Sequence, residues 1–194
     1  MNQSPVRLAI LASGNGTNAE AIMRYFQRHE KIRVALLLSN NPEAFALKRA
    51  TKFTIPTRVF NREQFKGQEI VRWLKEEGVT HVVLAGFLWL VPPSLLHAFP
   101  NKIINIHPSL LPKHGGKGMY GDRVHEAVKD SGDKKSGITI HLVNENFDEG
   151  RIIFQAECPV EPADTPQSIA AKVHALEHLH YPRVLEEWVS DTRN

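Results

Sequence analysis

Asn105 and His107 are the residues of this 194-residue chain whose types and spacing point most directly to chemistry. They lie at the end of the apolar run 102–106, and Pro108 follows at once. Because they stand two residues apart, their side chains share one face if the segment is extended. An amide can stabilise a developing oxyanion and an imidazole can carry a proton, so the pair suits chemistry at a carbonyl carbon. We therefore predict an active site at the end of a strand.

A glycine-rich segment, 13–18, follows the first apolar run of the chain. A turn that joins a strand to a helix presents free backbone N–H groups to an anion, and its glycines allow close approach. The segment lacks the third glycine of a dinucleotide motif and the lysine of a Walker loop. It is equally consistent with an anion site and with a tight turn in which Thr17 or Asn18 caps the helix.

Strand-like and helix-like patterns alternate along the chain. The predicted strands cover residues 6–12, 32–38, 57–60, 81–85, 103–106, 137–143 and 152–160. The predicted helices cover residues 18–28, 42–51 with Asn41 as its cap, 62–77, a short segment after Pro92, 122–129 and 166–190. This order predicts an α/β fold whose sheet is parallel at first and turns antiparallel in its last two strands.

Composition narrows the class of protein. The formal charge of +3 is small and scattered, so we expect no nucleic-acid partner. No apolar run reaches the ~18 residues of a membrane span, and residues 1–5 are too polar and short for a signal sequence, so we expect a cytoplasmic protein without a membrane partner. The single cysteine, Cys158, has no neighbouring base and is predicted to be structural. Length predicts one domain, 1–194.

Four segments in order, 13–18, 84–87, 105–112 and 148–150, resemble the folate-dependent formyltransferases. The resemblance extends from about residue 6 to about residue 189. It implies a single doubly wound, Rossmann-like, mostly parallel sheet with late antiparallel strands. It also implies transfer of a formyl group from the co-substrate 10-formyltetrahydrofolate to the amine of glycinamide ribonucleotide. Both partners are small molecules, and the oligomeric state is left open.

The same resemblance implies catalytic roles for three residues. Asn105 would donate a hydrogen bond to the oxyanion of the tetrahedral intermediate. His107 would be protonated, to stabilise that oxyanion or to pass a proton to the departing folate nitrogen. Asp148 would raise the pKa of His107 through its opposite charge. From the residues alone, an ordinary turn residue is the favoured interpretation of Asp148, because turns favour Asp.

Binding residues also follow from the resemblance. Those implied for glycinamide ribonucleotide are Gly16, Thr17, Asn18, Pro108 and Glu177, with the first three at its phosphate. Those implied for the folate are Arg62, Leu88, Trp89, Leu90, Val91, Asn105 and Asn144. Two features depart from the family pattern. Trp89 stands where relatives often carry Arg, and the loop 113–121 is longer and richer in glycine, which makes it a candidate lid.

One motif suggests a different chemistry. His174, Glu177 and His178 match the H-x-x-E-H pattern of inverted zinc proteases, with both histidines on one helical face. A zinc site also needs a third ligand, which that family supplies from far downstream. The carboxylates that follow here are Glu186, Glu187 and Asp191. We expect no metal, and we interpret the motif as a chance match.

Three other functions stay open as alternatives. A formyltetrahydrofolate deformylase uses a similar Asn, His and Asp to transfer the formyl group to water, but it carries an additional N-terminal domain. The first predicted strand begins at Val6, so we expect no such domain here. A methionyl-tRNA formyltransferase adds a C-terminal RNA-contacting domain, and none is expected after the last helix. A non-catalytic nucleotide-binding module would need the glycine turn but not Asn105, His107 and Asp148 together.

Overall fold

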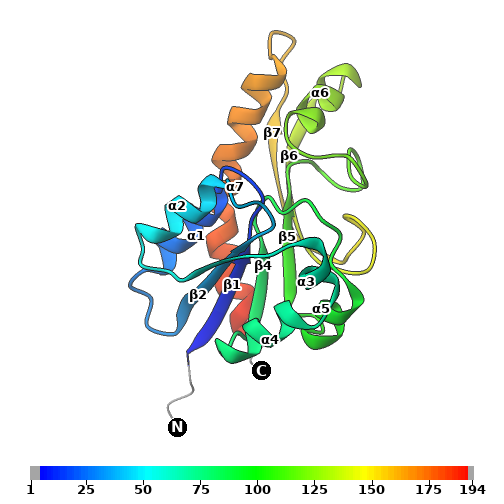
Figure 1. The fold of residues 1–194 in the computed structure, drawn as a ribbon. Coiled ribbons are helices and arrows are strands. Elements are labelled where there is room, and N and C mark those ends of the chain that lie inside the picture. Colours follow the sequence, from blue (N-terminus) through cyan, green and yellow to red (C-terminus); the bar gives the residue numbers. More distant parts are fainter. Residues whose placement is uncertain (1–4, 192–194) are drawn as a thin grey trace.

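A computed structural model describes residues 5–191, and within them seven strands form one sheet (Figure 1). Of the N-terminal segment 1–5, for which no signal sequence is expected, residues 1–4 lie outside this range. The strands are β1 (Val6–Leu11), β2 (Ile32–Ser39), β3 (Thr57–Val59), β4 (His81–Leu84), β5 (Ile103–His107), β6 (Lys135–Leu142) and β7 (Ile152–Pro159).

The strand order is β3-β2-β1-β4-β5-β6-β7. Strands β1 to β5 are parallel, whereas β6 runs antiparallel to β5 and β7 antiparallel to β6. The predicted doubly wound sheet with late antiparallel strands is therefore confirmed. Its order reverses between β1 and β4, and the crevice beyond the carboxyl ends of strands at such a point is where open α/β sheets bind ligands.

Helices cover both faces of the sheet (Figure 1). They are α1 (Thr17–Phe26), α2 (Phe45–Thr51), α3 (Arg62–Lys66), α4 (Glu69–Glu76), α5 (Pro93–Ala98), α6 (Asp122–Asp130) and α7 (Pro166–Asp191). Alternating residues of β1 point to opposite faces. Leu8 and Ile10 belong to a buried core with α1, α2 and α7, and Ala9 and Leu11 to a second core with α3, α4 and α5. No helix of the described residues is long and apolar enough to span a membrane.

Two helix predictions were wrong in their limits. Helix α2 begins at Phe45 and not at residue 42, because Asn41 uses its side chain to accept a hydrogen bond from the Glu43 N–H at 3.0 Å in a local turn. The single helix predicted over 62–77 is two helices, α3 and α4. The break is at Gly67, which follows α3 in an extended conformation.

Tyr181 joins helix α7 to the centre of the sheet. Its ring is fully buried, and its hydroxyl donates to the Leu84 carbonyl at 2.9 Å, with the Ile104 carbonyl 3.4 Å away. Leu84 ends β4 and Ile104 lies in β5, so one side chain connects the long helix to the two strands that lead into the crevice.

We predict that Tyr181→Phe lowers the free energy of unfolding by about 1–2 kcal/mol, because the variant leaves buried carbonyls without their donor. Urea denaturation followed by far-UV circular dichroism measures the loss. Tyr120→Phe is the matched control, since Tyr120 is 45% exposed and should change stability little. Equal stabilities of the Tyr181→Phe variant and the wild type would contradict this role for the hydroxyl.

Candidate active site

A cavity of about 610 Å³ lies beyond the carboxyl ends of β1, β4 and β5. Its lining includes residues 14–18 after β1, residues 85–88 after β4 and residues 105–108 at the end of β5. The glycine turn and the Asn105–His107 pair therefore share one cavity, as the sequence predicts. Pro108, Asp148 and Glu177 line the same cavity.

Asn105 and His107 lie on one face of β5, which extends through His107. Strand β6 pairs Asn105 with His141 and His107 with Thr139 across the antiparallel ladder. His107 is 4% exposed, so a ring that has to carry a proton is almost removed from water. The strand thus holds both groups rigidly at the floor of the cavity.

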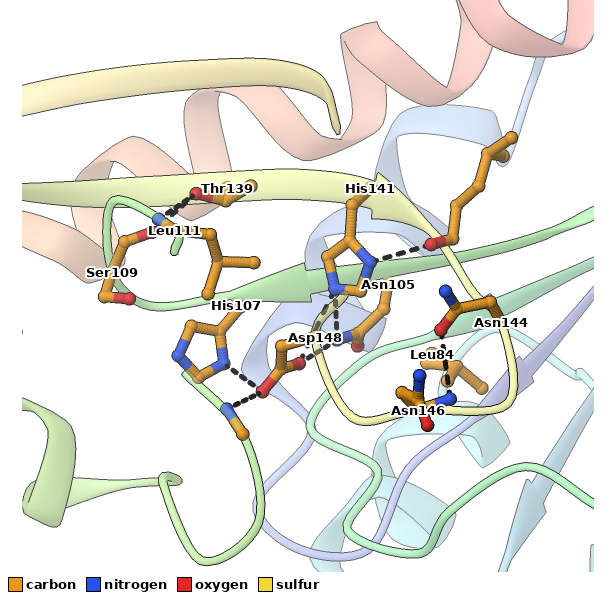
Figure 2. Close-up of polar contacts among 12 residues, drawn as sticks. Leu84, Asn105, His107, Ser109, Leu111, Thr139, His141, Asn144, Asn146 and Asp148 are labelled. Carbon is orange, nitrogen blue, oxygen red and sulfur yellow. Dashed lines mark hydrogen bonds and ion pairs between the residues drawn. The ribbon is translucent and has the colours of Figure 1, made fainter. Parts of the chain in front are cut away.

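Asp148 comes from the loop between β6 and β7 and meets both residues (Figure 2). Its Oδ2 lies 3.4 Å from Nδ1 of His107 and accepts a hydrogen bond from the Gly116 N–H at 3.0 Å. Its Oδ1 lies 3.4 Å from Nδ2 of Asn105. The backbone at Asp148 has φ 58°, a left-handed conformation that Asp tolerates better than most residues. This turn conformation therefore delivers the carboxylate to the histidine.

His141 is a member of this group that the sequence interpretation missed. Its Nδ1 lies 2.8 Å from the Leu142 carbonyl, which can only accept, so Nδ1 carries a proton. In the neutral ring Nε2 is then the acceptor for Nδ2 of Asn105 at 3.1 Å, and it lies 3.6 Å from Oδ1 of Asp148 (Figure 2). A signal was present, since Thr139 and His141 are polar at alternate positions of the segment 138–143, whose other residues are apolar.

The second nitrogen of His107 is also engaged. Nε2 lies 2.8 Å from the backbone carbonyl of His114 and donates its proton there. The same loop is held by His114 itself, whose Nε2 lies 2.8 Å from Oδ2 of Asp133. The His107 ring thus lies between a carbonyl, to which it donates, and the Asp148 carboxylate.

Burial and neighbouring groups both shift the pKa values of His107 and Asp148. Burial lowers the pKa of His107, and the Asp148 charge and the His114 carbonyl oppose that effect without overcoming it. The Asp148 charge therefore acts to raise the pKa of His107, as expected. The net shift of that pKa is downward, however, so the expectation of a raised pKa is wrong. Burial also acts to raise the pKa of Asp148, but the His141 and His107 rings and the Gly116 N–H hold it below its ordinary value. Asp148 is therefore a carboxylate at neutral pH.

The glycine turn, residues 14–18, lines the same cavity. Gly16 is the N-cap of α1 with φ 74°, and a Cβ there would lie 2.5 Å from Cβ of Ala46, so glycine is required. No side chain of the described residues caps this helix, which contradicts the alternative that Thr17 or Asn18 does so. The first N–H groups of a helix have no partner within it and can bind an anion. Asn18 instead donates through Nδ2 to Oε2 of Glu177 at 3.0 Å.

A second cavity, of about 520 Å³, adjoins the first. Leu88 and Phe147 line both. The predicted folate residues that line the second cavity are Arg62, Leu88, Trp89, Leu90 and Val91. Trp89 is half-buried beside Phe60 and Phe65, and the Arg62 guanidinium lies 4.6 Å from the centre of its ring. Asn144 is not among the described residues that line either cavity; its side chain accepts from the Asn146 N–H at 3.0 Å (Figure 2).

The remaining motifs have plain structural surroundings. His174 lies 2.8 Å from Glu177 through Nδ1, and no group of three His, Cys, Asp or Glu side chains within residues 5–191 is placed to hold a metal ion. Burial raises the pKa of the Cys158 thiol, the opposite of what a nucleophile needs. The glycine-rich loop borders the catalytic cavity through residues 116–121.

Comparison with known proteins shows the family of this chain. The model of the family described as formyl transferase matches residues 6–185. The chain belongs to the formyl transferase family. It is 38% identical over 187 residues to "Phosphoribosylglycinamide formyltransferase" of Bacillus subtilis, with 93% of each chain covered. It is 42% identical to the chloroplastic protein of that name from Arabidopsis thaliana, of whose length the chain spans 64%.

Solved structures give the same result for the fold. The crystal structure of phosphoribosylglycinamide formyltransferase from Anaplasma phagocytophilum superposes with a TM-score of 0.88 at 36% identity, covering 97% of this chain and 89% of that one. The corresponding structure from Bacillus halodurans gives a TM-score of 0.86 at 38% identity, with 96% of both chains covered. This formyl transferase therefore shares its fold with them.

The lowered pKa of His107 predicts how the stability of this formyl transferase depends on pH. The unfolded chain, with a His107 pKa near 6.5, binds a proton that the folded protein resists. Stability should therefore fall as the pH drops from about 7.5 to about 5.5, and more steeply in the wild type than in His107→Gln. Urea unfolding at each pH measures the difference. Parallel curves for the two proteins would show that the folded state does not disfavour the charged ring.

Proposed function

We propose that this chain transfers the formyl group of 10-formyltetrahydrofolate to the amine of glycinamide ribonucleotide, a step of purine biosynthesis. The observation that carries the proposal is one cavity lined both by the glycine turn and by Asn105, His107 and Asp148. Relatives named for this activity, at 34–42% identity over most of the chain, support it.

The ribonucleotide is proposed to bind along the first cavity. Its phosphate accepts hydrogen bonds from the free N–H groups that follow Gly16, at Thr17 and Asn18. The buried Glu177 carboxylate lies further along the same wall and accepts from hydroxyl groups. The amine then reaches the floor of the cavity beside Pro108 and His107. The Asn18 side chain keeps its hydrogen bond to Glu177, so Asn18 binds the phosphate through its backbone N–H.

The folate is proposed to occupy the second cavity and to enter the first where Leu88 and Phe147 line both. The lining is apolar at Leu90, Val91 and Trp89, as a flat heteroaromatic or benzoyl group requires. Arg62, held over Trp89, supplies a cation for a carboxylate of the folate. Trp89 therefore holds that cation in place.

In the proposed reaction the amine attacks the formyl carbon and the carbonyl oxygen becomes an oxyanion. Asn105 can donate to it by giving up its long contact, 3.4 Å, with Asp148 while it keeps the 3.1 Å bond to His141. One such donor contributes about 3 kcal/mol to the transition state. The tetrahedral intermediate then collapses, the bond from carbon to the folate nitrogen breaks, and that nitrogen takes up a proton.

His107 is proposed to move the proton. The amine loses one proton when it becomes an amide, and the folate nitrogen gains one. One residue that accepts the first proton and then donates it to the folate nitrogen is therefore sufficient. A neutral His107 accepts at Nδ1, because Nε2 already donates to the His114 carbonyl. The Asp148 carboxylate at 3.4 Å stabilises the imidazolium so formed. The low pKa of the resting ring leaves it free to accept that proton.

The proposal is tested by incubating the purified protein with 10-formyltetrahydrofolate, with and without glycinamide ribonucleotide. We expect tetrahydrofolate and formylated ribonucleotide to appear together, in equal amounts, in the complete mixture. Release of formate at the same rate without the ribonucleotide would show a deformylase and would overturn the proposal. Absence of turnover in either mixture would overturn both functions.

Asp148→Asn should lower kcat by about a hundredfold or more and leave KM for both substrates little changed, because the charge acts on the protonated histidine. Glu149→Gln is the matched control, since it removes an exposed carboxylate from the same loop. Adding His107→Ala to Asp148→Asn should cost little more than the worse single change. Near-normal kcat in Asp148→Asn would show that Asp148 serves its turn alone.

A further inference from the structure

His125 is a buried histidine that the reaction above does not use. It lies on α6, which packs against α7, and it is 2% exposed. Among residues 5–191, its Nδ1 has no hydrogen-bond partner. Burial lowers the pKa of His125, so the ring is neutral at neutral pH. Buried polar groups almost always have partners, and one without a partner in the folded chain indicates an unfilled role.

A second buried atom shares this property. Oδ1 of Asn18, on α1, has no partner among the described residues. The orientation of this amide is decided by its other end, because Nδ2 donates to a carboxylate oxygen of Glu177 at 3.0 Å and a carboxylate can only accept. Oδ1 is therefore an acceptor that lacks a donor.

The two atoms belong to one wall of the catalytic cavity. Asn18, His125, His174 and Glu177 all line it, from helices α1, α6 and α7. Glu177 links them, since its Oε2 accepts from Asn18 and lies 2.8 Å from Nδ1 of His174. The His174 ring in turn lies 6.3 Å from the His125 ring, edge to face. The two unpaired atoms therefore belong to residues that are linked through Glu177 and His174.

We propose that His125 is a substrate-binding residue that, together with Oδ1 of Asn18, binds the sugar hydroxyls of the ribonucleotide. The acceptor at Asn18 needs a donor, and a neutral imidazole nitrogen needs either a donor or an acceptor. A hydroxyl supplies both, whereas a phosphate supplies acceptors and would leave Asn18 unmet. The Glu177 carboxylate, which accepts from hydroxyls, favours the same group. This inference rests on the proposed ribonucleotide substrate and adds a residue that distinguishes its sugar.

The test measures both substrate affinity and stability. A substrate-binding role of His125 predicts that its loss weakens affinity, and a purely structural role predicts that its loss lowers stability. His125→Leu removes the unpaired polar atom, so its melting temperature should match or exceed that of the wild type. Its Kd for glycinamide ribonucleotide, measured by calorimetry without a formyl donor, should rise about tenfold. His125→Asn retains a hydrogen-bonding group near the position of Nδ1 and should bind within about threefold of the wild type.

A matched control and a matched ligand sharpen the result. His81 is also 2% exposed, but its Nδ1 lies 2.9 Å from the Thr80 hydroxyl and it lies outside the cavity lining. His81→Leu should lose stability and keep the Kd. The 2′,3′-dideoxy analogue of the ribonucleotide should bind the wild type and His125→Leu equally well.

The outcomes separate the inference from the function. If the wild type does not bind the ribonucleotide, the proposed function fails. If the wild type binds it and His125→Leu binds it as tightly, the function stands and the role of His125 is refuted. A lower melting temperature with an unchanged Kd would show that His125 serves the fold. An unfolded Leu variant would also contradict the inference, because removal of an unpaired polar atom should not unfold the protein.

Discussion

The Asp148 carboxylate is the group on which the site depends. It is delivered by a turn with left-handed backbone, and it meets His107, Asn105 and the Gly116 N–H in a setting where burial disfavours any charge. A buried carboxylate is stable only when such partners surround it. These partners come from the end of β5 and from the loop that follows it, so the carboxylate proposed to serve the reaction also connects that strand end and that loop to its own loop.

The sheet explains how these segments meet. Parallel strands β1, β4 and β5 end at one edge, which brings the Gly16 turn and the Asn105–His107 pair to a common cavity. Strand β6 returns antiparallel beside β5, so His141 lies opposite Asn105 and the loop after β6 reaches back over the edge. Helix α7, tied to β4 by Tyr181, carries Glu177 to the same place. The proposed catalytic and binding groups thus depend on one order of strands.

The sequence predicted this arrangement where a local pattern carries the information. Most of the strands are apolar runs with clear ends, and the spacing of Asn105 and His107 placed both on one face. The start of α2 and the break at Gly67 were missed because side-chain turns and a single extended glycine decide them. His141 was missed because only strand pairing brings it to Asn105. The net pKa shift of His107 depends on burial, which no local pattern shows.

The central claim is that the Asp148 charge acts on the His107 ring across the 3.4 Å between them. The most direct measurement is the titration of the His107 ring nitrogens by ¹⁵N NMR in the unliganded wild type and in Asp148→Asn. Our account predicts a lower His107 pKa in the variant, because an uncharged amide no longer opposes the effect of burial. A His107 titration that is the same in both proteins would contradict it.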